Sequence, residues 1–113
     1  MVFDLVKGLF DGNVEEIAPD EVVDGDYVVL DVRGKDAYQA GHIPGALHLP
    51  YSNLDEKWDE VLANIDYEDE IAVICVRGIS SKSVAGKLME AGYKNVKSVQ
   101  GGMNAWNGEV EHA

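Results

Sequence analysis

The chain contains a single cysteine, Cys75, and the residue types around it are those that produce a reactive thiolate. An apolar run at residues 71–74 ends at this cysteine, and a short loop at residues 76–81 follows it. A helical pattern begins directly after the loop, so the loop N–H groups and the helix dipole both favour negative charge at the sulfur. Arg77 places a cation nearby, which favours a lower thiol pKa. A small core cysteine is the ordinary alternative, but the Gly, Ser and Arg residues of the loop favour the reactive interpretation.

The elements that must position Cys75 alternate between strand patterns and helix patterns. Apolar runs predict three buried strands and two shorter ones, at residues 27–30, 71–74, 96–99, 14–18 and 46–49. Helices are expected at residues 2–10, 20–24, 35–40, 54–65 and 82–89, with a short one through residues 105–106. In the run at 46–49, the alternation predicts that Leu47 and Leu49 face inward and His48 outward.

Strands that are apolar on both faces and alternate with helices predict a parallel sheet covered on two sides. Ligands of such folds bind at the carboxyl ends of the strands. Cys75 lies at one of these ends, and Asp31 lies at another. The sequence therefore places the chemistry at this edge of the sheet.

Length and composition restrict the class of protein further. The chain has 113 residues and a formal net charge of −12, which indicates one globular domain and disfavours nucleic acid or a membrane surface as a partner. No apolar stretch approaches the roughly 18 residues of a membrane span. A lone cysteine and no recognisable signal peptide fit a reducing, cytoplasmic location.

Three segments together resemble the single-domain form of the rhodanese family of sulfurtransferases. They are residues 30–33 with the Gly-His-Ile-Pro-Gly-Ala motif at 41–46, the cysteine loop at 75–81, and residues 101–106. The resemblance implies an α/β, rhodanese-like fold with a central parallel sheet of about five strands flanked by helices on both faces. It divides the chain into an N-terminal helical extension, 1–13, and a rhodanese-like domain, 14–113.

The resemblance also implies a reaction. Cys75 would take sulfane sulfur from thiosulfate, hold it as a persulfide, and pass it to cyanide or a thiol. The loop that would bind the substrate and stabilise the persulfide consists of Val76, Arg77, Gly78, Ile79, Ser80 and Ser81. Oriented N–H groups and a guanidinium suit a dianionic substrate, and the two serines are able to cap the helix or donate hydroxyl groups.

Asp31 and Arg33 are candidates for the border of the pocket. Asp31 equally suits a carboxylate that accepts backbone N–H groups where its strand ends, and Arg33 suits a structural pair with an acidic neighbour. We expect no metal and no cofactor. The expected partners are a small anionic sulfur donor, a thiol or cyanide acceptor, and protein sulfur donors or acceptors.

Other functions fit parts of the same pattern. In a sulfur-relay module, protein partners would load and unload the persulfide on Cys75. A phosphatase of this fold would need a longer cysteine loop with an arginine where Ser80 and Ser81 stand. A silent binding domain is disfavoured by the cysteine itself.

Overall fold

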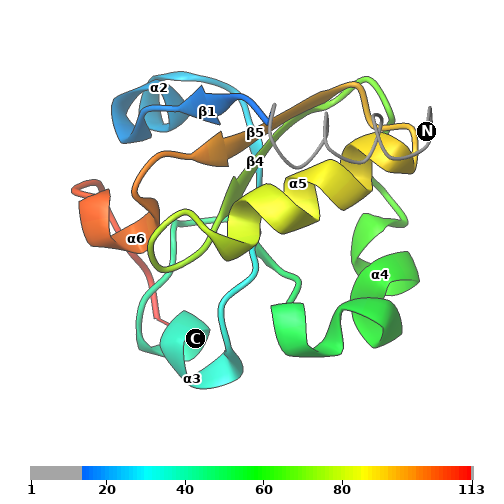
Figure 1. Ribbon diagram of the computed structural model, residues 1–113. Helices are drawn as coiled ribbons and strands as arrows, with labels where there is room; N and C mark the ends of the chain where they lie inside the picture. Colours follow the sequence, from blue (N-terminus) through cyan, green and yellow to red (C-terminus); the bar gives the residue numbers. More distant parts are fainter. Residues whose placement is uncertain (1–13, 113) are drawn as a thin grey trace.

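The computed structural model describes residues 14–112, and its centre is one five-stranded sheet (Figure 1). All neighbouring strands pair in parallel, in the order β1-β5-β4-β2-β3. The strands are β1 (Glu16–Ile17), β2 (Val28–Asp31), β3 (Leu47–His48), β4 (Glu70–Ile74) and β5 (Asn95–Val99). The helix expected within residues 1–13 lies outside the described residues.

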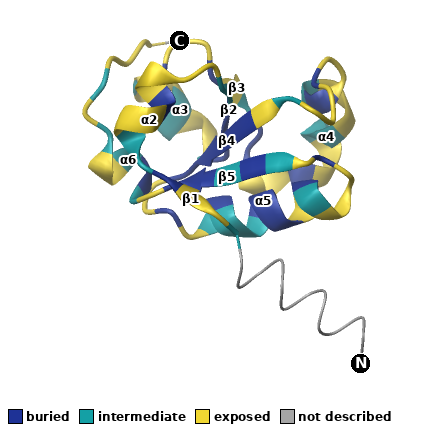
Figure 2. Cartoon of the chain, turned by 90° about the horizontal axis from the view of Figure 1, so that it is seen from above, coloured by how far each residue is buried: buried dark blue, intermediate teal, exposed yellow. Residues whose placement is uncertain are grey.

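Helices cover both faces of the sheet, and each face has its own apolar cluster. The first face carries α4 (Leu54–Leu62) and α5 (Ser80–Glu90). A short 3₁₀ helix, η1 (Tyr51–Asn53), leads directly into α4. The second carries α2 (Pro19–Asp24), α3 (Lys35–Ala40) and α6 (Gly102–Ala105). Figure 2 shows the buried strands between these two layers. The predicted fold, a parallel sheet of five strands flanked on both faces, is confirmed.

The central strand β4 shows why the sheet is buried on both sides. Ile71 and Val73 belong to the cluster under α4 and α5, whereas Ala72 and Ile74 belong to the cluster on the opposite face. All four residues are completely buried. An unbroken apolar run is what a parallel strand between two helical layers requires. It also fixes the position of Cys75, which directly follows Ile74.

The prediction of which side chains face inward at residues 47–49, around the edge strand β3, was wrong for two of the three. Leu47 is 40% exposed, and His48 is half-buried, while Leu49 is fully buried as expected. The strand ends at His48, so the two leucines do not share one face of a regular strand. His48 is covered because its ring stacks on Tyr38 and its Nε2 lies 2.8 Å from the Arg33 carbonyl oxygen. Tertiary contacts therefore override the alternation.

Among residues 14–112, no helix is both long and apolar enough to cross a membrane.

Candidate functional site

Cys75 follows β4 at the carboxyl edge of the sheet, beneath a cavity of about 370 Å³. The residue is 4% exposed, so its sulfur is sheltered but reaches the cavity. The cavity is lined by Val32, Arg33, Gly34, Cys75, Val76, Arg77, Ile79 and Ser80. The cysteine that the sequence predicts to react therefore lies beneath a hollow of the size of small-molecule pockets.

Two loop residues contact the sulfur directly. The Gly78 N–H donates to Cys75 Sγ across 3.0 Å, and Ser81 Oγ lies 3.3 Å from the same sulfur. Gly78 adopts φ +91°, a left-handed conformation that glycine tolerates readily, and this turn directs its N–H inward. The sulfur thus accepts from the Gly78 N–H, and its S–H donates to Ser81 Oγ while Cys75 is a thiol. Once ionised, the sulfur accepts from the Ser81 hydroxyl instead.

These donors decide the ionisation of Cys75. Burial opposes the charged form and favours a higher pKa. Hydrogen bonds from the Ser81 hydroxyl and from the backbone N–H groups of Ser81, Gly78 and Arg77 outweigh it. The pKa of the Cys75 thiol therefore lies below its ordinary value, as hydrogen bonding to a charged form dictates. Arg77 lowers this pKa through its backbone N–H. The sequence had suggested that the guanidinium of Arg77 would lower it.

The serines of the loop do not cap the helix, contrary to one expectation. Helix α5 begins at Ser80, so Ile79 occupies the cap position and no side-chain capping bond forms. Ser81 lies in the first turn, where its buried hydroxyl is 2.6 Å from Ser98 Oγ on β5 as well as close to the sulfur. A capping serine must precede the helix, and these two serines lie inside it.

Sequence reasoning missed Ser98. This residue is completely buried. The signal was a small polar residue two positions after Val96, and so on the same apolar face of the predicted strand.

The two candidates for the pocket border have different positions. Arg33 lines the cavity, while Asp31 is completely buried and is not among the lining residues. Arg33 Nε and Nη2 donate to the Asp31 carboxylate at 2.8–3.2 Å, and Nη2 also donates to the Gly41 carbonyl at 2.7 Å. This bidentate pair fixes the guanidinium, whose side chain is 9% exposed, against the buried carboxylate.

The loop that follows Cys75 is held from its other side by α6 (Figure 1). The N–H groups of Met103 and Asn104 donate to the carbonyl oxygens of Cys75 and Val76, at 2.7 and 3.0 Å. Gly102 approaches these carbonyls so closely that a Cβ atom there would lie 2.3 Å from the Cys75 oxygen. The start of α6 is therefore a backbone support for the cysteine loop.

The six predicted loop residues divide into two groups. Gly78 and Ser81 bond the sulfur from within, while Val76, Arg77, Ile79 and Ser80 line the cavity. Of the lining side chains, Val76 and Ile79 are 48% and 66% exposed, so two apolar side chains lie side by side with Arg77 at the mouth. The mouth of the cavity is thus both apolar and cationic.

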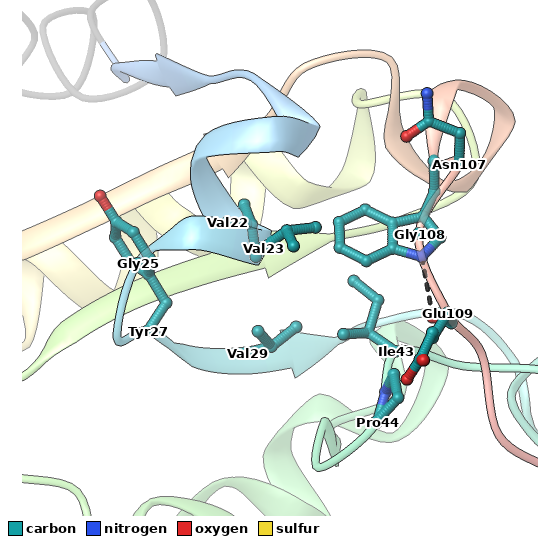
Figure 3. Close-up of a pocket in the computed structure, with 11 residues that line it drawn as sticks. Val22, Val23, Gly25, Tyr27, Val29, Ile43, Pro44, Asn107, Gly108 and Glu109 are labelled. Carbon is teal, nitrogen blue, oxygen red and sulfur yellow. Dashed lines mark hydrogen bonds between the residues drawn. The ribbon is translucent and has the colours of Figure 1, made fainter.

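A larger cavity of about 700 Å³ lies between α2, β2 and the segment after α6 (Figure 3). Val22, Val23, Val29 and Ile43 supply apolar walls, and a hydrogen bond from Trp106 Nε1 to the Glu109 carbonyl spans 3.0 Å at its edge. Cys75 is not among its lining residues. It belongs to the opposite face of the sheet from the Cys75 cluster.

Comparison with known proteins defines the class to which this fold and site belong. The family profile of the rhodanese-like domain matches residues 16–109. The chain therefore belongs to the rhodanese family, as its motifs suggested.

Three relatives show the range of the similarity. The thiosulfate sulfurtransferase GlpE of Coxiella burnetii is 43% identical over 81 residues, covering 72% of each protein. The adenylyltransferase and sulfurtransferase UBA4 of Meyerozyma guilliermondii is 36% identical over 80% of this chain, which spans 22% of that longer protein. A solved rhodanese-related protein from Thermoplasma volcanium has a TM-score of 0.71 at 30% identity, covering 81% of this chain and 89% of that one. These similarities support sulfurtransferase activity.

Proposed function

We propose that the protein transfers sulfane sulfur from thiosulfate to a thiophilic acceptor through a persulfide on Cys75. The observation that carries the proposal is the sulfur of Cys75, held by Gly78 N–H and Ser81 Oγ beneath a cavity with arginines at its rim. The thiosulfate sulfurtransferase relative adds support.

In the first half-reaction, the Cys75 thiolate attacks the outer sulfur of thiosulfate. A bond forms between the two sulfurs, the bond to the sulfite sulfur breaks, and sulfite leaves with its electron pair. The outer sulfur remains on Cys75 as a persulfide anion. The donors that lower the thiol pKa would also stabilise this anion, because the negative charge moves only from the Cys75 sulfur to the sulfur bonded to it.

In the second half-reaction, an acceptor attacks the terminal sulfur of the persulfide. Cyanide would leave as thiocyanate, and a thiolate would leave as a new persulfide, regenerating the Cys75 thiolate in either case. The sequence contains no second cysteine, so no thiol of this chain competes for the sulfur.

The arginines that line the cavity suit thiosulfate as the sulfur donor. Thiosulfate is a dianion, and the chain carries a net charge of −12, so binding depends on local positive charge. Arg33 and Arg77 both line the cavity. The Asp31 carboxylate offsets the charge of the Arg33 guanidinium, so the exposed Arg77 is the cation better suited to attract the dianion.

The direct test is the intact mass of the protein after brief incubation with thiosulfate and again after cyanide. We expect a gain of one sulfur atom that cyanide removes, and no gain in Cys75→Ser. A thiol that stays free to alkylation after thiosulfate treatment would reject thiosulfate as the donor.

A second candidate is a sulfur relay in which protein thiols load or unload Cys75. The exposed apolar side chains of Val76 and Ile79 favour it, because a small dianion has no use for them. The UBA4 relative also includes a sulfurtransferase in a larger protein. Loading by cysteine persulfide combined with negligible loading by thiosulfate would favour the relay.

A further inference from the structure

A buried pair of hydroxyl groups connects Cys75 to the neighbouring strand β5. Ser81 Oγ lies 3.3 Å from Cys75 Sγ and 2.6 Å from Ser98 Oγ. Both serines are completely buried. Among the described residues, Ser81 supplies the side-chain hydrogen-bond partner of Ser98 Oγ.

The residues around Ser98 on its face of the sheet are apolar. Ser98 pairs in register with Val73 of β4, which belongs to the core under α5, and Val96 of the same core precedes it by two residues. A hydroxyl group in such a place is costly unless it is hydrogen-bonded. The bond to Ser81 satisfies it, but a valine would avoid the cost altogether.

The chemistry of the sulfur fixes the direction of these hydrogen bonds. As a thiol, Cys75 donates its S–H to Ser81 Oγ. A thiolate or persulfide anion only accepts, so in that state the single hydroxyl proton of Ser81 points to Cys75. Ser98 must then be the donor in its bond to Ser81. In this arrangement each hydroxyl polarises the next, which strengthens the bond to the anion.

Without Ser98, the hydroxyl of Ser81 has an alternative. The hydroxyl proton of a serine rotates to suit the acceptors around it. A proton turned away from the sulfur no longer stabilises its charge. The bond from Ser98 favours the rotamer in which the Ser81 proton meets Cys75.

We propose that Ser98 is a positioning residue, whose hydroxyl donates to Ser81 and so directs the Ser81 hydroxyl onto the Cys75 sulfur. The proposal rests on the proposed function in one respect, that Cys75 reacts as an anion. It adds a residue from β5 to the hydrogen-bonding groups around the sulfur, which otherwise come from the β4–α5 loop and the first turn of α5.

The test measures the rate of Cys75 alkylation by iodoacetamide against pH, in the absence of any sulfur donor. The midpoint of this profile reports the thiol pKa, so it does not depend on thiosulfate being the substrate. We expect Ser81→Ala to raise the midpoint by about one pH unit, the size of a charge-assisted hydrogen bond. Ser98→Ala should raise it by less, in the same direction.

Two further variants separate positioning from packing. The double variant Ser81→Ala with Ser98→Ala should have the midpoint of Ser81→Ala alone, because Ser98 acts through Ser81. Ser98→Thr keeps the hydroxyl and should restore the wild-type midpoint. Ser83→Ala removes a hydroxyl from the same helix, away from the sulfur, and serves as the matched control.

A purely structural role for Ser98 would change thermal stability and leave the midpoint alone. The proposal is overturned if Ser98→Ala has the wild-type midpoint, or if the shifts of the two single variants add in the double variant. A failure of thiosulfate to load the protein would instead reject the proposed function and leave this result standing.

Discussion

The close approach of α6 to the cysteine loop gives the most quantitative prediction, through Gly102→Ala. Gly102 has φ +58°, and a Cβ atom there would lie 2.3 Å from the Cys75 carbonyl oxygen and 2.6 Å from that of Val76. Both contacts are with backbone, which cannot rotate aside as a side chain can. The start of α6 must therefore move away from the loop.

The cost has two parts. A left-handed conformation costs an alanine about 1–2 kcal/mol. Moving α6 also weakens the bonds from Met103 and Asn104 to the loop carbonyls, which are 2.7 and 3.0 Å long, at about 0.5–1.5 kcal/mol each. The free energy of unfolding should thus fall by about 2–5 kcal/mol, a large share of the about 5–15 kcal/mol of a typical domain.

Gly45→Ala is the matched control. Gly45 has φ +82°, but a Cβ atom there would meet nothing within 4 Å. This variant carries the conformational cost alone, about 1–2 kcal/mol. The difference between the two variants isolates the contact between α6 and the loop.

Urea denaturation of both variants measures the free energies of unfolding, and the alkylation rate of Cys75 at neutral pH reports the site. Gly102→Ala should lose about 1–3 kcal/mol more than Gly45→Ala, and its Cys75 should react more slowly, because the loop donors shift from the sulfur. Equal losses in the two variants would refute the reasoning that this approach is tight.

Three other perturbations test the site. Since the pKa of Cys75 is lowered in the folded state, the unfolded chain binds more protons between the two pKa values, and the free energy of unfolding should rise with pH across that window. Urea titrations should show that Cys75→Ser abolishes this rise, and a rise that persists would contradict it. Arg77→Ala keeps the backbone N–H, so thiosulfate loading should slow while the alkylation midpoint stays constant; a shifted midpoint would restore the guanidinium as a cause. Asp31→Asn leaves the guanidinium of Arg33 without its buried partner and should cost about 3–5 kcal/mol in urea denaturation, whereas an unchanged stability would show that the pair is dispensable.

The sequence predicted those features that are encoded locally. The run at residues 71–74, the loop after Cys75 and the helix pattern behind it adjoin one another, so their arrangement follows from propensity and periodicity. The parallel sheet followed from strands that are apolar on both faces.

The features that sequence reasoning missed depend on segments far apart in the chain. Ser98 meets Ser81 only because β5 lies beside β4, and nothing in the run at 96–99 identifies its partner. The exposure of Leu47 depends on where β3 ends and on the ring of Tyr38 that covers His48. The approach of Gly102 to the cysteine loop likewise requires α6 to return to the end of β4.

The structure separates the groups that ionise Cys75 from the groups that face the substrate. The pKa of the thiol is lowered by backbone N–H groups and the buried Ser81 hydroxyl, and a substitution of an exposed side chain leaves the backbone donors in place. The cavity wall consists instead of side chains such as Val76, Arg77 and Ile79, whose replacement alters charge and shape at the mouth. We therefore expect substitutions at these three positions to change donor and acceptor preference while the pKa of Cys75 stays lowered. Under the proposed function, one site built in this way would support either thiosulfate turnover or exchange with protein thiols, and we expect the residues that line the cavity to decide between them.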